Sequence, residues 1–173
     1  MKHGFFHRLD VYGRRATPAL TFLLLLLVGL LPVPIAGLPA IAPLFTLIAV
    51  YYWSIYRPEY MPPWLVLALG LIEDLSSGSA LGLSATTLLL VHLGVAAQRR
   101  FFISRPFVAA WWGFILVGAL AAIGRWLLLG ALTGNYVALH LAAFQYALTL
   151  ALCPCIAWLL AQAQRHLLKP VDE

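Results

Sequence analysis

The chain alternates long apolar stretches with short polar connections. Most of the stretches approach the roughly 20 residues that a helix needs to cross about 30 Å of hydrocarbon. Prolines, glycines and a few charged residues separate them. The pattern predicts an all-α polytopic membrane protein, a six-transmembrane-helix bundle that forms one integral membrane domain over residues 1–173, with a basic tail at 1–18. The predicted spans are 19–35, 38–56, 63–77, 80–97, 107–130 and 136–162.

The composition agrees with this pattern. Of the 173 residues, 63% are hydrophobic and 10% are charged, and the mean hydropathy is +0.93. A soluble domain of this length needs more charged surface than that. Membrane topology explains the basic excess, so nucleic acid is not expected as a partner. The first apolar stretch follows basic residues, as in a signal peptide, but further spans come at once and we expect an uncleaved first helix.

The positions of the basic residues indicate how the spans are oriented. Cytoplasmic connections are rich in Lys and Arg. Of the 11 Lys and Arg residues, all but Arg125 lie in the N-terminal tail, in alternate connections or at the C-terminus. With six spans these positions share one side, so we expect both termini in the cytoplasm. The residues concerned are Lys2, Arg8, Arg14, Arg15, Arg57, Arg99, Arg100, Arg105, Arg165 and Lys169.

Two adjacent acids lie inside the third predicted span. Glu73 and Asp74 belong to the stretch LIEDLSSGSALG, residues 71–82. The helical steps from Pro62 to Asp74 add up to roughly 18 Å. Both acids therefore fall within or near the hydrocarbon, where ionisable side chains are costly and usually face protein or water.

Helical spacing predicts different surroundings for the two acids. Gly70, Asp74 and Gly78 recur at every fourth position and form a stripe of small residues, along which a neighbouring helix approaches closely. We expect Asp74 to point into the bundle. Glu73 lies about 100° away around the helix and is expected to face a vestibule, a headgroup or a partner. Gly78 and Gly82 are expected to form a tight turn.

The remaining base, Arg125, lies in the fifth predicted span. Counting from Phe107 places it roughly 27 Å along the helix, near the far interface. Our hypothesis is an intramembrane ion pair in which Arg125 neutralises Asp74 or Glu73 across the bundle. The alternative is that Arg125 extends outward to the headgroups.

No arrangement typical of an enzyme accompanies these charges. Adjacent carboxylates diverge on a helix, and the sequence has no nucleophile–base set or nucleotide fingerprint. His92 and His140 lie singly on apolar spans. We therefore expect no catalytic residue, no cofactor and no metal. A proton-coupled transporter stays open as an alternative, because such transporters use acids and bases within a helix bundle.

The stretch LIEDLSSGSALGLSA, residues 71–85, resembles the signature of the bacterial rod-shape-determining MreD family. The stretch LIAVYYWSIYRP, residues 47–58, also resembles the family's second span. Glu73 is not part of the family pattern, and LPAIAP before the second span is less polar than in many members. The family role is therefore assigned to Asp74 and not to Glu73. The matching residues are Asp74, Leu75, Ser77, Gly78, Leu81 and Gly82.

The resemblance implies a non-enzymatic component of the cell-elongation machinery, multi-pass in the bacterial inner membrane. Such proteins contact the transmembrane helix of MreC and, through it, act with MreB, RodA and the elongation transpeptidase in peptidoglycan synthesis; membrane lipid surrounds them. The family is also similar in fold to the substrate-binding components of energy-coupling-factor transporters. The alternative function is therefore a small-molecule-binding or proton-coupled transporter component. A scaffold needs an exposed groove for a partner helix, whereas a binder needs an enclosed polar pocket.

Overall fold

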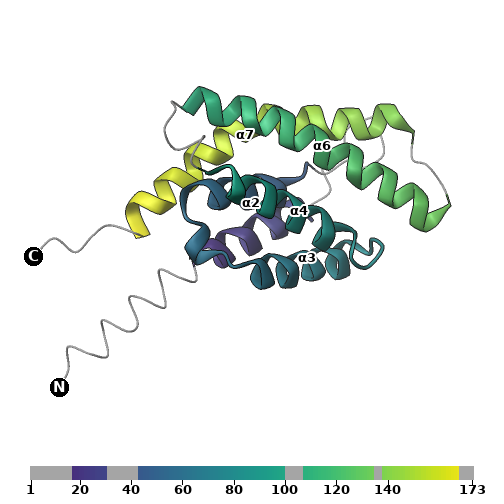
Figure 1. Ribbon diagram of the computed structural model, residues 1–173, viewed down its shortest axis with the longest axis horizontal. Helices are drawn as coiled ribbons and strands as arrows, with labels where there is room; N and C mark the ends of the chain where they lie inside the picture. Colours follow the sequence, from purple (N-terminus) through teal and green to yellow (C-terminus); the bar gives the residue numbers. More distant parts are fainter. Residues whose placement is uncertain (1–16, 31–42, 100–106, 135–137, 168–173) are drawn as a thin grey trace, which may run out of the picture.

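The computed structural model describes residues 17–30, 43–99, 107–134 and 138–167. These residues form helices and their connections, and no strand occurs among them, so the all-α prediction is confirmed. Figure 1 shows their arrangement. In chain order the helices are Thr17–Gly29, α2 (Phe45–Tyr56), the 3-10 helix η1 (Pro58–Tyr60), α3 (Pro63–Ser77), α4 (Leu83–Ala97), α6 (Phe107–Thr133) and α7 (Leu139–Leu167).

Each of the six predicted spans overlaps one of the α-helices, but the bounds differ. The first helix begins at Thr17, α2 begins only at Phe45 because residues 43 and 44 are not helical, and α6 and α7 continue to Thr133 and Leu167. Two helical segments, Ala110–Thr133 and Leu139–Arg165, are long and apolar enough to cross a membrane. Membrane crossing by the six predicted spans stays a prediction, as do the orientation and the similarity to energy-coupling-factor components. Residues 1–16 and 31–42, together with the bases Arg100, Arg105 and Lys169, lie outside the described residues.

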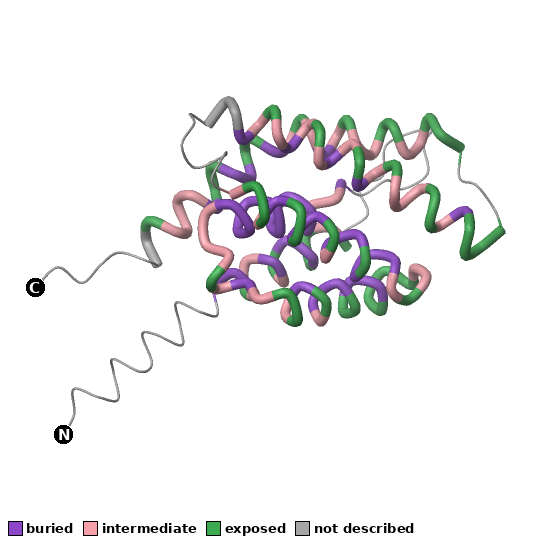
Figure 2. Tube along the Cα trace, in the orientation of Figure 1, coloured by how far each residue is buried: buried purple, intermediate pink, exposed green. Residues whose placement is uncertain are grey.

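Helix α2 lies at the centre of the fold. Its residues from Thr46 to Ile55 are all buried, and Figure 2 draws nearly the whole helix in the colour of buried residues. Helices α4 and α7 both pack against it. Helices α6 and α7 run side by side along one edge, and α3 lies beside α4 at the opposite edge (Figure 1). A helix that is apolar all round is suited to such a central position.

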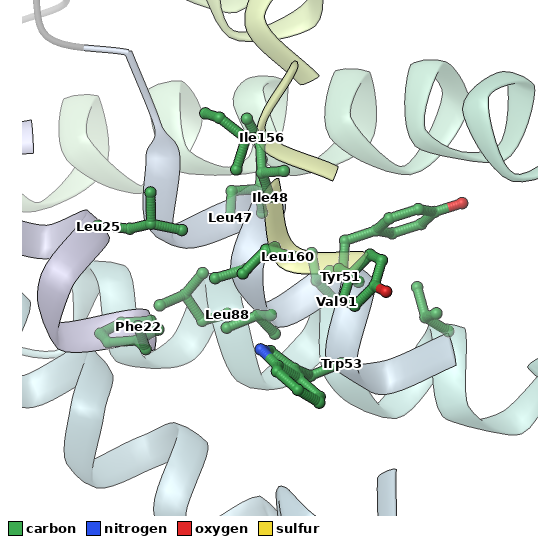
Figure 3. Close-up of a cluster of buried hydrophobic side chains, with 14 of the residues drawn as sticks. Phe22, Leu25, Leu47, Ile48, Tyr51, Trp53, Leu88, Val91, Ile156 and Leu160 are labelled. Carbon is green, nitrogen blue, oxygen red and sulfur yellow. The ribbon is translucent and has the colours of Figure 1, made fainter. Parts of the chain in front are cut away.

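The core side chains come from helices that are far apart in sequence. Trp53 is fully buried and its Nε1 donates to Thr21 Oγ1 at 3.0 Å, so the indole is both packed and hydrogen-bonded. Ser54 Oγ and His92 Nδ1 lie 2.8 Å apart and join α2 to α4. Figure 3 shows the apolar cluster to which Trp53 belongs, with Phe22, Leu25, Leu47, Ile48, Tyr51, Leu88, Val91, Ile156 and Leu160.

Helices α3 and α4 are in close contact at Gly70. A Cβ atom added to Gly70 would lie 2.4 Å from Ala85 Cα and 2.8 Å from Ala85 N. Only a glycine fits there, so the close helix contact predicted from the stripe of small residues is confirmed at this position. The contact brings the last turn of α3 beside the first turn of α4.

Candidate functional site

The turn between α3 and α4 is built on two glycines. Gly78 has φ 65° and its N–H donates to Asp74 O; Ser79 N also donates to this carbonyl, at 3.2 Å. Gly82 has φ 91° and directly precedes α4. Both values lie in the left-handed region that side chains disfavour. The prediction that these two glycines form a tight turn is confirmed.

The Asp74 carboxylate accepts hydrogen bonds from four donors in this turn and at the start of α4. Oδ1 accepts from Ser79 Oγ at 3.0 Å and from Ser84 N at 2.9 Å. Oδ2 accepts from Gly82 N at 2.9 Å and from Ala85 N at 3.4 Å. The N-cap residue of α4, Gly82, provides no side-chain cap, and the first N–H groups of a helix have no partner within it. Asp74 therefore caps the N-terminus of α4 from the preceding helix. The dipole of α4 also stabilises a negative charge at this end.

Asp74 is only 1% exposed, as the small-residue stripe predicts. All three backbone donors belong to the start of α4, and the fourth donor, Ser79 Oγ, belongs to the turn. This one side chain thus fixes the end of α3, the turn and the start of α4 relative to one another. Because all four donors are used to join these elements, we expect Asp74 to have a structural role.

Ser84 connects this centre to Arg125. Its hydroxyl is buried and accepts a hydrogen bond from Arg125 Nη1 at 2.7 Å, while its N–H donates to Asp74. Among the described residues, Arg125 forms no ion pair within 4.0 Å of either Asp74 or Glu73. Arg125 is thus linked to Asp74 through Ser84. Neutralisation of either acid by Arg125 stays a prediction.

Sequence reasoning missed the role of Ser84. Its position was an available signal, because it is the second residue of α4 and serine is common near helix N-termini. Its bond to Arg125 spans 41 residues of sequence. No local pattern predicts such a contact.

Glu73 is also buried, but its surroundings differ from those of Asp74. It is 8% exposed, and its Oε2 has no hydrogen-bond partner among the described residues. It lines a cavity of about 140 Å³ together with Thr46, Arg125 and Gln145. The two acids, adjacent in sequence, therefore differ: both oxygens of Asp74 accept hydrogen bonds, whereas Glu73 lines a cavity and one of its oxygens has no partner within the described part of the chain.

Asp74 and Ser77 of the motif lie in the last turn of α3 and its glycines in the connection to α4, whereas its two leucines face away from the core. Ser77 Oγ donates to Glu73 O at 2.8 Å and so closes the last turn of α3. Leu75 and Leu81 are 69% and 67% exposed. They form an apolar outer surface at this end of α3 and α4.

A second charged cluster lies at the C-terminal end of α2. Arg99 Nε donates to Ile55 O at 3.0 Å, which satisfies a carbonyl of the last helical turn. Glu59 lies 3.5 Å from Arg57 and 3.7 Å from Arg99. These two arginines belong to the set predicted to face the cytoplasm.

Together, the fold and the site define an all-α protein with apolar helices and a buried carboxylate that caps one helix from another. The family model for rod shape-determining protein MreD matches residues 12–167, and the chain belongs to this family. The family is a shape-determining structural component and not a known enzyme family. No curated protein and no solved structure matches the chain. The resemblance of the signature at residues 71–85 to MreD is thereby confirmed.

Proposed function

We propose that this protein is a multi-pass component of the bacterial inner membrane that docks MreC and supports peptidoglycan synthesis during cell elongation. Family membership gives the role in rod shape and places MreC in the same system. The six spans with cytoplasmic termini are part of this proposal, and the alternating positions of the bases support them. MreB, RodA and the elongation transpeptidase are reached through MreC. In this proposal Asp74 holds α3 and α4 in a fixed position relative to each other.

A groove between α4 and α6 is the observation that carries the docking proposal. Its volume is about 340 Å³, and none of its lining residues is charged. A Cβ atom added to Gly94 or to Gly124 meets nothing within 4 Å, so both glycines face open space. Exposed leucines, Leu90, Leu116 and Leu120, flank them.

The occupant proposed for this groove is the transmembrane helix of MreC. Helices in lipid gain little from the hydrophobic effect and associate by close packing at small residues. The α4–α6 groove has a glycine on each wall, so a third helix can approach both walls at once. Its uncharged lining suits an apolar helix.

The test is to fill the groove and measure how much MreC is recovered. Gly94→Leu and Gly124→Leu each place a large side chain in open space, and leucine is a better helix former than glycine. We expect unchanged stability of the protein but several-fold lower recovery of co-expressed MreC after purification in mild detergent. Ala151→Leu, a similar enlargement at an exposed position of α7, is the matched control. Full recovery of MreC with both glycine variants refutes this docking surface.

A small-molecule-binding or proton-coupled transporter component is the alternative. Purification from native membranes separates the two functions. MreC in near-equal amount supports docking, whereas a stoichiometric small molecule recovered without MreC supports the alternative.

A further inference from the structure

The cavity beside Glu73 combines polar groups from three helices and from the start of a fourth. It lies where the end of the helix Thr17–Gly29 and the start of α2 meet α3, α6 and α7. Glu73 provides a buried carboxylate oxygen without a partner among the described residues. A buried charge without a hydrogen-bond partner is unfavourable. This oxygen is therefore free to accept a hydrogen bond from a bound ligand.

The same cavity also presents a positive charge. Arg125 lines it, and a guanidinium group carries five N–H donors, of which Nη1 supplies the bond to Ser84. Thr46 and Gln145 add a hydroxyl and an amide to the lining. The cavity thus holds an acid with one oxygen that lacks a donor in the part of the chain that the structure describes, together with a base that can serve a further acceptor.

We propose that this cavity binds a small zwitterionic group, with its primary ammonium on Glu73 and its anionic part on Arg125. A volume of about 140 Å³ corresponds to four or five water molecules at about 30 Å³ each, so the group bound is small. Two sources carry this chemistry, the phosphoethanolamine headgroup of a membrane lipid and a free amino acid. The inference rests on the proposed membrane location and is independent of MreC docking.

Apolar residues on the same wall favour the lipid as the source. Leu25, Leu26, Leu30 and Phe45 line the cavity beside its polar groups, and they offer a path for acyl chains that a free amino acid does not need. The neighbouring face of the helix Thr17–Gly29 exposes Leu24 and Leu27. A headgroup held at Glu73 can therefore keep its chains against this helix.

The first test uses the unchanged full-length protein without MreC. It is placed in nanodiscs of phosphatidylethanolamine mixed with phosphatidylcholine, and the lipid that stays bound is measured by native mass spectrometry. The choline headgroup has the same charges but no N–H to donate to Glu73. We expect at least fivefold preferential retention of phosphatidylethanolamine. In detergent, phosphoethanolamine is expected to raise the thermal unfolding midpoint.

The second test changes the acid. Glu73→Gln is expected to weaken phosphatidylethanolamine retention at least tenfold, while Glu59→Gln, an exposed acid outside the cavity, leaves it unchanged. A midpoint raised by glycine without lipid retention supports the same site with a free amino acid as its ligand. Equal retention of both lipids, with no midpoint shift by glycine or phosphoethanolamine, overturns the proposal. That result is read on the unchanged protein and leaves MreC docking unaffected.

Discussion

Replacement of Asp74 by alanine tests whether one side chain holds the turn and the start of α4. The carboxylate accepts short bonds from Gly82 N and Ser84 N, both at 2.9 Å, besides longer ones. In Asp74→Ala these N–H groups lose their acceptor at a position that is 1% exposed. The two helices also lose the bonds that fix them to each other.

The magnitude follows from the donors left without a partner. A buried unsatisfied donor costs about 1–3 kcal/mol, and loss of a helix N-cap costs about 0.5–2 kcal/mol. These contributions overlap because they concern the same bonds, so we expect Asp74→Ala to lower the free energy of unfolding by about 2–5 kcal/mol. Asp74→Asn keeps the shape but directs an amide N–H₂ toward backbone donors, and about half that loss is expected. Ser79→Ala removes one donor, and a loss of about 1 kcal/mol is expected.

The assay is reversible unfolding in mixed micelles, with the helical circular dichroism signal followed as the denaturing detergent increases. Glu59→Gln is the control, because its side chain is 47% exposed. The expected order of stability is Glu59→Gln, Ser79→Ala, Asp74→Asn and Asp74→Ala, from most to least stable. If Asp74→Ala matches Glu59→Gln, the cap does not hold the two helices together.

Three further outcomes are expected in the same unfolding assay. Gly70→Ala should lower the free energy of unfolding by about 1–3 kcal/mol through overpacking, because its Cβ would lie 2.4 Å from Ala85 Cα. A Cβ at Gly94 meets nothing within 4 Å, so Gly94→Ala should be neutral or slightly stabilising. Equal effects of the two substitutions contradict the close helix contact. Gly82→Val should lower the free energy of unfolding by about 1–3 kcal/mol because φ is 91° there. Ser76→Ala, at an exposed position, is the control, and a valine variant as stable as this control shows that the turn adapts. Thr21→Val should lower the free energy of unfolding by about 1–3 kcal/mol, because it leaves the buried Trp53 N–H without its acceptor. Thr133→Val, at an exposed position where the hydroxyl donates to Leu129 O, is the comparison, and matching losses argue against a role for the Trp53 bond.

The two buried acids, Glu73 and Asp74, are neighbours in sequence but differ in how their carboxyl groups are hydrogen-bonded. Asp74 is tolerated because donors surround both of its oxygens. Glu73 has no such set, and it faces a cavity that also contains Arg125. One acid thus stabilises the fold, and the other is placed where a ligand can complete its hydrogen bonding.

The sequence by itself indicated which stretches form helices, because apolar stretches are bounded by prolines, glycines and charges, although several helix ends differ from the predicted ones. The span predicted at 63–77 coincides with α3, Pro63–Ser77. Spacing along α3 also predicted the burial of Asp74, since it defines which residues share a helix face. The two glycines in the short connection predicted a tight turn there, because glycine adopts backbone conformations that other residues avoid. Family membership was likewise readable from the motif at residues 71–85.

The tertiary structure alone decided which groups meet across the bundle. The link from Asp74 through Ser84 to Arg125, the bond between Ser54 and His92, and the groove between α4 and α6 all join residues from separate helices. Hydrophobic periodicity defines the buried face of each helix but not its partner, because apolar faces are interchangeable until their shapes and polar groups are matched. Helix positions are therefore local information, whereas the surroundings of Glu73 exist only once five segments have packed.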